Sequence, residues 1–145
     1  MALICASHQR LLGTPLVDPE LSPQVAAHWL AEEAPFCVLA HDASADPCFI
    51  YANRAACDCF EYSREELVGL PSRLSAEAPD RAERQALLDA VAAQGFATGY
   101  RGLRIAKSGR RFWIEDVTVW NLIDEAGVHH GQAATYRRIT PYEGN

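Results

Sequence analysis

The sequence predicts an α+β domain in which one five-stranded antiparallel sheet carries helices over one face. Near the C-terminus, three segments of strand composition follow one another and are joined by short Gly-containing turns: Tyr100–Ala106, Arg111–Ile123 and Val128–Ile139. Two shorter segments, Phe36–His41 and Cys48–Ala52, form a hairpin earlier in the chain. The helical patterns between these two groups indicate that helices and strands are segregated, as in α+β domains.

Bulk composition is that of one globular domain. The chain has 145 residues, of which 49% are hydrophobic and 22% charged, and its net charge is -6. An acidic chain has no general attraction for phosphates, so we expect no nucleic acid and no membrane partner. The N-terminus lacks a basic start, and the five cysteines are irregularly spaced. We therefore expect a cytoplasmic protein with reduced thiols.

The N-terminal region contains one clear helix start. Ser22 followed by Pro23 is an N-cap followed by Pro in the first turn, and Pro35 ends the helix. Its apolar stripe either packs on the domain or forms a dimer contact. That stripe comprises Val25, Ala26, Trp29 and Leu30.

Capping patterns place the helices of the middle region. Asn53 is expected to cap a helix over Arg54–Phe60, and Ser63 with Glu66 has the spacing of a capping box. A second box, Asp80 with Glu83, predicts a longer helix that extends to about Gln94.

This order of elements resembles that of a PAS domain. Residues 51–55 (YANRA) and 60–69 (FEYSREELVG) are similar to the PAS pattern, departing at Glu61, where Gly is common. Further segments are similar to the PAS-related MEKHLA family, which includes stand-alone bacterial proteins: Leu70–Glu77, Arg84–Leu88, Gly109–Phe112, Val119–Leu122 and Gly127–Ala134.

The resemblance implies strand order 2-1-5-4-3 and a sensing or dimerising module. It divides the chain into an N-terminal helical extension (1–35), a PAS-like MEKHLA domain (36–140) and a tail (141–145).

The resemblance also argues against two cofactors. The Leu70–Ser75 region lacks the cysteine of cysteinyl-flavin sensors, and the long helix has no haem-ligating histidine. Non-covalent flavin and a small organic ligand remain open.

Small residues on the last strand predict a cavity between the sheet and the helices. They are Gly131, Ala133 and Ala134, with Gly102 on the third strand. The alternative is that Trp113, Trp120 or Phe96 fills this space.

Five residues are predicted to bind the ligand: Gln132, Asn121, Trp120, Tyr136 and Arg73. A Gln between Gly and Ala on a central strand is costly to bury without partners, and amides supply both donors and acceptors. Arg73 or Arg84 could clamp a carboxylate or phosphate, although ion pairs with Glu77, Asp80 or Glu83 are the favoured alternative for them.

No metal site is expected. Cys57 and Cys59, like His129 and His130, are too close in sequence to point the same way. No nucleophile–base pair can be assembled from spacing, so a binding module is favoured over an enzyme. The prediction is a sensory module that binds a small molecule and acts as a homodimer or through a partner. A small enzyme using the same cavity and a ligand-free dimerisation domain are the alternatives.

Overall fold

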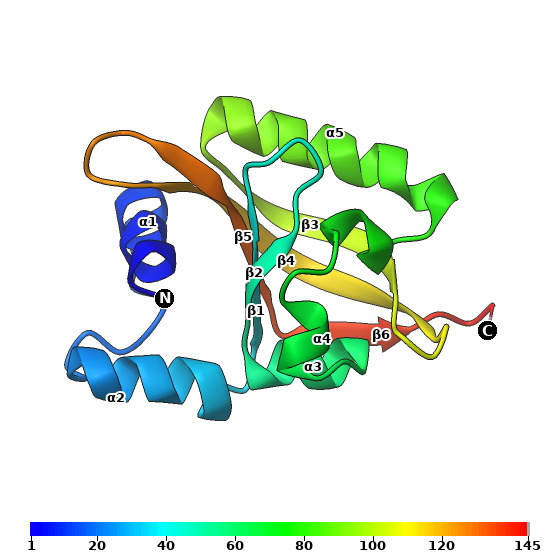
Figure 1. Ribbon diagram of the computed structural model, residues 1–145, viewed down its shortest axis with the longest axis horizontal. Helices are drawn as coiled ribbons and strands as arrows, with labels where there is room; N and C mark the ends of the chain where they lie inside the picture. The colour runs from blue at the N-terminus through cyan, green and yellow to red at the C-terminus, as the bar shows by residue number, and fades with distance from the viewer. Residues whose placement is uncertain (145) are drawn as a thin grey trace.

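A computed structural model describes residues 1–144 and contains one antiparallel sheet (Figure 1). The strand order is β2-β1-β5-β4-β3, which confirms the predicted order and places the first and last of the five strands side by side. The strands are β1 (Cys37–Asp42), β2 (Phe49–Ala52), β3 (Phe96–Ile105), β4 (Arg111–Ile123) and β5 (His129–Tyr136).

The predicted final strand is divided in two. β5 ends at Tyr136, and a short strand β6 (Arg138–Pro141) follows and pairs with the first half of β4. Asp116 in β4 has a positive φ of 53° at the point where the pairing passes from β6 to β5. The predicted tail therefore begins inside β6, and its last residue, 145, lies outside the described residues.

Three α-helices cover one face of the sheet (Figure 1). They are α3 (Arg54–Phe60), α4 (Arg64–Leu67) and α5 (Ala78–Gln94), with a 3₁₀ turn at Ser72–Ser75. The capping box of Ser63 and Glu66 is present as predicted. The box predicted for Asp80 and Glu83 is wrong, because α5 begins at Ala78 and Asp80 lies in its first turn. The core beneath these helices includes Leu39, Phe60, Val91, Phe112 and Val117.

The N-terminal helices cover the opposite face (Figure 1). They are α1 (Ala2–Leu12) and α2 (Pro23–His28), which continues as a π-helical turn over Trp29–Glu33. Leu30 of this segment is completely buried, whereas Val25 is 53% exposed. Most of the predicted apolar stripe thus packs on the domain. A second core forms here around Ile4, Leu30, Val38, Trp120 and Leu122.

Asn53 connects these layers. Its Oδ1 accepts hydrogen bonds from the amides of Val38 (3.0 Å) and Ala56 (3.1 Å), which confirms the predicted cap of α3. Its Nδ2 donates to the carbonyls of Leu30 (3.1 Å) and Phe36 (2.9 Å). One buried amide therefore joins the N-terminal segment, β1 and α3, and all four bonds lie within the protein.

Glu61 occupies a backbone conformation that favours glycine. It ends α3 with φ 65°, at the position where the PAS pattern commonly has Gly. Its carboxylate accepts from Arg110 Nε and from the amide of Ser108, both at 3.2 Å. These contacts hold the α3 end against the β3–β4 turn and help to offset the local strain.

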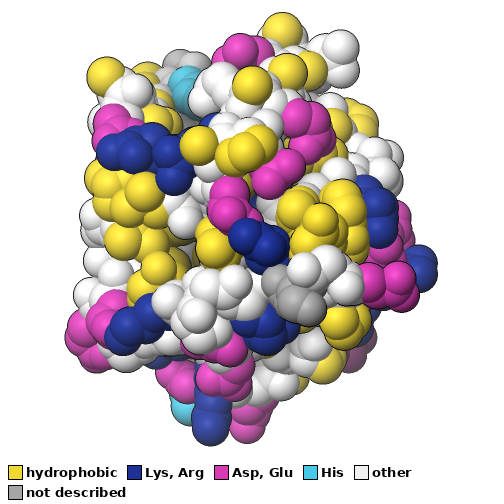
Figure 2. All heavy atoms as spheres, turned by 90° about the vertical axis from the view of Figure 1, so that its right-hand side faces the viewer, with side chains coloured by type: hydrophobic (Ala, Val, Ile, Leu, Met, Phe, Trp, Pro, Cys, Tyr) yellow, Lys and Arg dark blue, Asp and Glu magenta, His cyan; other side chains and the backbone are white. Residues whose placement is uncertain are grey.

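Two general features bear on function. Among residues 1–144, no helix combines the length and the apolar character needed to cross a bilayer. On the face that carries the β3–β4 turn and the C-terminus, basic and acidic side chains are interspersed (Figure 2). Several basic side chains of the protein are paired, as in Arg110–Glu61 and Arg64–Glu32. This face presents no broad basic patch.

Candidate functional site

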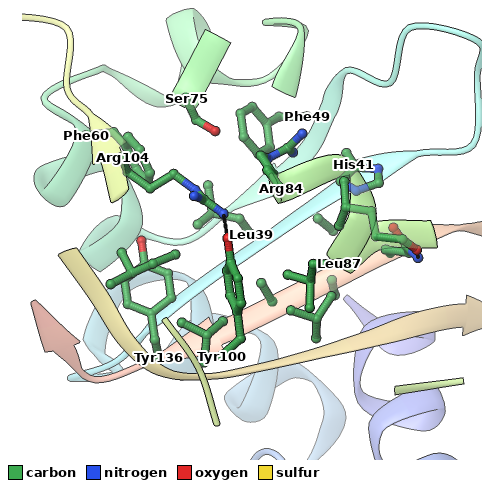
Figure 3. Close-up of a pocket in the computed structure, with 18 residues that line it drawn as sticks. Leu39, His41, Phe49, Phe60, Ser75, Arg84, Leu87, Tyr100, Arg104 and Tyr136 are labelled. Atoms are coloured by element: carbon green, nitrogen blue, oxygen red, sulfur yellow. Dashed lines mark hydrogen bonds between the residues drawn. The ribbon is translucent and has the colours of Figure 1, made fainter. Parts of the chain in front are cut away.

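A cavity of about 60 Å³ lies between the sheet and α5 (Figure 3). Leu39, Phe49, Ile114 and Val117 contribute apolar walls from the sheet, and Leu87 lines it from α5. A buried water needs on the order of 10–15 Å³ measured this way, so the space holds a few waters or a small organic molecule. A cavity is therefore present where the sequence predicts one.

The large side chains proposed as alternatives do not fill this space. The indole of Trp120 lies on the opposite face, where Nε1 donates to the carbonyl of Ile4 at 3.2 Å. Trp113 packs under the Arg101 guanidinium, 3.7 Å from its ring centre, and Phe96 is 38% exposed. None of the three lines the cavity.

The glycines act differently from the prediction. A Cβ on Gly102 would lie 2.4 Å from Tyr100 Oη and 2.6 Å from an Arg104 nitrogen, so those side chains occupy the space above it. A Cβ on Gly131 would lie 1.9 Å from the carbonyl oxygen of His41, and its φ is +141°. Gly131 thus permits close approach of the β1 backbone and does not enlarge the cavity.

Arg84 is the most unusual residue of the site. It projects from α5 into the cavity (Figure 3) and is only 7% exposed. The ion pair expected with a nearby acid is not made, because Glu77 pairs with Arg111. Within residues 1–144, no hydrogen bond or ion pair is found for Arg84. Burial, together with the charge of Arg104, lowers the Arg84 pKa to about 10, so the group remains charged at neutral pH.

Arg104 brings a second guanidinium into the same cavity from β3. It is 6% exposed, and it donates to Tyr100 Oη at 3.2 Å (Figure 3). It also donates to the carbonyl of Leu103 at 2.9 Å. Both partners are neutral groups. Among the described residues that line the cavity, none is Asp or Glu.

His41 supplies an acceptor. Its Nδ1 bonds the carbonyl of Asp42 at 2.9 Å, so Nδ1 carries the proton and Nε2 keeps its lone pair. Burial lowers the His41 pKa, which favours this neutral form. Nε2 is buried and has no hydrogen-bond partner within residues 1–144.

The predicted pair Gln132 and Asn121 fastens α5 to the sheet. Gln132 Nε2 donates to the carbonyl of Leu88 at 2.9 Å and to Asn121 Oδ1 at 3.2 Å. Asn121 Nδ2 in turn donates to the carbonyl of Val91 at 3.0 Å. Gln132 also lines the cavity, whereas Asn121 lies behind it.

The other predicted residues are dispersed. Tyr136 lines the cavity, where its hydroxyl lies 3.7 Å from Cys59 Sγ and burial raises its pKa. Arg73 lies outside, with its Nε 3.1 Å from Asp46 Oδ1 on the surface. The structure thus brings Gln132 and Tyr136 to the cavity and keeps Asn121 as support. It places Arg73 in the surface depression beside the cavity and Trp120 on the opposite face of the sheet.

A surface depression adjoins the cavity. It lies between the β1–β2 loop, the 3₁₀ turn and α5, and it shares His41, Arg84, Leu88 and Gln132 with the cavity. These four side chains therefore separate the interior space from solvent and mark the entrance.

Five polar cavity residues were not among the five predicted: His41, Ser75, Arg84, Tyr100 and Arg104. For Arg84 the sequence carried a signal. Residues 84, 88 and 91 have the spacing of one helix face, so Arg84 shares the inward stripe of Leu88 and Val91.

The fold is that of a PAS domain, as three solved structures show. The PAS domain of a protein from Colwellia psychrerythraea is 19% identical, with a TM-score of 0.69 over 84% of this chain and 98% of that one. A PAS domain from a two-component sensor histidine kinase is 22% identical (TM-score 0.61, 80% and 93% covered). An RNA-binding light-oxygen-voltage receptor is 24% identical (TM-score 0.68), and the match spans 83% of this chain but 33% of that receptor.

Within this class, the chain belongs to the MEKHLA domain family, whose model matches residues 1–141. The match includes the N-terminal helices as well as the PAS-like part. A search of curated proteins finds no match.

Proposed function

We propose that this protein is a sensory module that holds a small organic molecule in the cavity between the sheet and α5. The observation that carries the proposal is His41 Nε2, a buried cavity atom without a hydrogen-bond partner, together with the Arg84 guanidinium, which lines the same cavity, is largely buried and makes no hydrogen bond or ion pair within residues 1–144. Buried polar groups are almost always hydrogen-bonded, because leaving one unpaired is costly. A bound molecule that carries an acceptor would satisfy the guanidinium, and a donor on that molecule or on a water beside it would satisfy His41 Nε2.

Helix α5 is the element that would transmit binding. Only Arg84 and Val91 of its 17 residues are buried, and Gln132 and Asn121 hold it to the sheet by side-chain bonds. A molecule between α5 and the sheet would add contacts to both. Its binding would therefore change how firmly α5 is held, which a partner could detect.

Homodimerisation and a cytoplasmic location remain part of the proposal. Because Leu30 packs on the sheet, a dimer contact through α2 would rely on exposed residues such as Val25. All five cysteines are free, which fits a reducing compartment. The net charge of -6 supports a partner other than nucleic acid.

Native mass spectrometry of freshly purified protein, with a visible absorption spectrum, tests the binding proposal. We expect an added mass that is released on denaturation. A flavin would make the protein yellow and would require α5 to move, because the cavity has about 60 Å³. A clean apo mass, with no stabilisation by any compound of a small-molecule panel, would contradict the proposal.

A further inference from the structure

Building on the proposed function, we infer that the ligand is a small organic carboxylate whose charge is held by Arg84 and Arg104. Three observations support this assignment: the charge of the cavity, the lack of an internal counter-ion, and the apolar side chains that form most of the remaining wall.

The cavity contains two cations that come from different elements. Arg84 projects from α5 and Arg104 from β3, each more than nine-tenths buried, and Figure 3 shows both side chains directed into the space. The two positive charges are close enough that Arg104 disfavours the charged form of Arg84. Together they create a positive potential in a poorly hydrated space.

The acidic side chains beside the cavity make hydrogen bonds or ion pairs with residues other than Arg84. The adjoining depression contains Asp42, Asp46 and Asp89. Asp42 accepts from Ser44 and from the amide of Cys48, Asp46 pairs with Arg73, and Asp89 accepts from Gln85. Within residues 1–144, no carboxylate therefore neutralises Arg84.

A guanidinium that is largely removed from water and has no ion-pair partner is costly, because its desolvation is not offset by an opposite charge. An anion that enters the cavity supplies the missing partner. Carboxylates match the planar donor fork of arginine and can accept two parallel hydrogen bonds from it. Tyr100 Oη already accepts from Arg104 and can donate its own proton to the same oxyanion.

The other walls determine the rest of the ligand. Leu39, Phe49, Leu87, Ile114 and Val117 enclose the space with apolar surface. A short hydrocarbon chain would bury against them, whereas inorganic phosphate would leave them without contacts. The volume of about 60 Å³ limits that chain to a few carbons.

The test measures dissociation constants by isothermal titration calorimetry for straight-chain carboxylates from acetate to hexanoate. Their neutral amides and inorganic phosphate are measured in parallel. We expect a carboxylate to bind roughly ten-fold or more tightly than its amide, with affinity that first rises with chain length. Arg84→Met and, separately, Arg104→Met should remove this preference.

Arg101→Met is the matched control. It makes the same change of charge on β3, but Arg101 pairs with Glu115 and stacks on Trp113 outside the cavity. It should keep the wild-type preference. In the absence of ligand, Arg84→Met should unfold at a urea concentration no lower than wild type, because it removes a charge that is largely desolvated and has no ion-pair partner. A clear decrease would assign Arg84 a structural role and overturn the inference.

The outcomes separate the two proposals. Amides that bind as tightly as carboxylates, or carboxylate binding that survives Arg84→Met, would overturn the anion inference and leave the binding function intact. Phosphate that binds as tightly as the best carboxylate would overturn the assignment to organic acids. If no carboxylate binds while native mass spectrometry shows another bound molecule, only the inference fails. If neither binds, both proposals fail.

Discussion

The Gln132 side chain donates a hydrogen bond to Asn121 across neighbouring strands, with Nε2 3.2 Å from Oδ1. Both amides also donate to main-chain carbonyls of α5. This pair is the polar connection between the sheet centre and the helix that roofs the cavity. It explains how a Gln flanked by Gly131 and Ala133 can be buried.

Replacing Gln132 by Leu should lower the free energy of unfolding by about 1–3 kcal/mol. The Leu88 carbonyl and Asn121 Oδ1 would lose their donor while remaining shielded from water. Urea unfolding measures the change. Gln85→Leu is the control, since Gln85 is exposed and bonds only Asp89 on the same helix. A change below about 0.5 kcal/mol for Gln132→Leu would show that the pair does not hold α5.

Replacing Ile4 by Ala should cost about 2–5 kcal/mol. Ile4 is 3% exposed and packs in the second core, where its carbonyl accepts from Trp120. The measurement tests whether the segment 1–35 contributes to the stability of the domain. Gln9→Ala on the exposed side of α1 serves as control. If Ile4→Ala left the unfolding midpoint at the wild-type value, α1 would not contribute to the stability of the domain.

Stability should fall as the pH is lowered from about 6.5 towards 5. Burial depresses the pKa of both His41 and His8 below the ordinary value of 6.5. In this range the unfolded chain binds more protons than the folded one, so protonation favours unfolding. The slope should be at most about 1.4 kcal/mol per pH unit for each histidine.

Urea unfolding at a series of pH values measures this slope. His8→Gln combined with His41→Gln should flatten it, whereas His28→Gln, at an exposed position of α2, should leave it unchanged. A slope that persists in the double variant would assign the pH dependence to other groups.

The fold was predictable because its signals are local or belong to a recognisable family pattern. The cap at Asn53 and the box at Ser63 depend on a few neighbouring residues, and both are present. The strand order came from the resemblance to PAS domains. The division of the last strand at Arg137 was not predicted, since it depends on pairing with a distant part of β4.

The site was harder to predict than the fold, because which side chains face the cavity depends on tertiary packing. Trp120 and Asn121 are neighbours on β4, so they point to opposite faces, and only one could have faced the cavity side. For Arg84, acids nearby in sequence favoured an ion pair, but Glu77 instead pairs with Arg111 from the sheet. The cavity itself was expected from small residues, yet Gly102 is covered by Tyr100 and Arg104.

The most direct test is a ¹H–¹⁵N NMR titration of the full chain with butyrate, which follows the backbone amides and the Arg84 and Arg104 Nε–H groups. If butyrate binds between Arg84 and Arg104, the shifts will converge on the cavity, in β1, β5 and α5, and the signals of both guanidinium groups will change. Butyramide should produce little shift at the same concentrations. Shifts confined to the outer surface or to the N-terminal helices, with the Arg84 signal unmoved, would contradict carboxylate binding in the cavity.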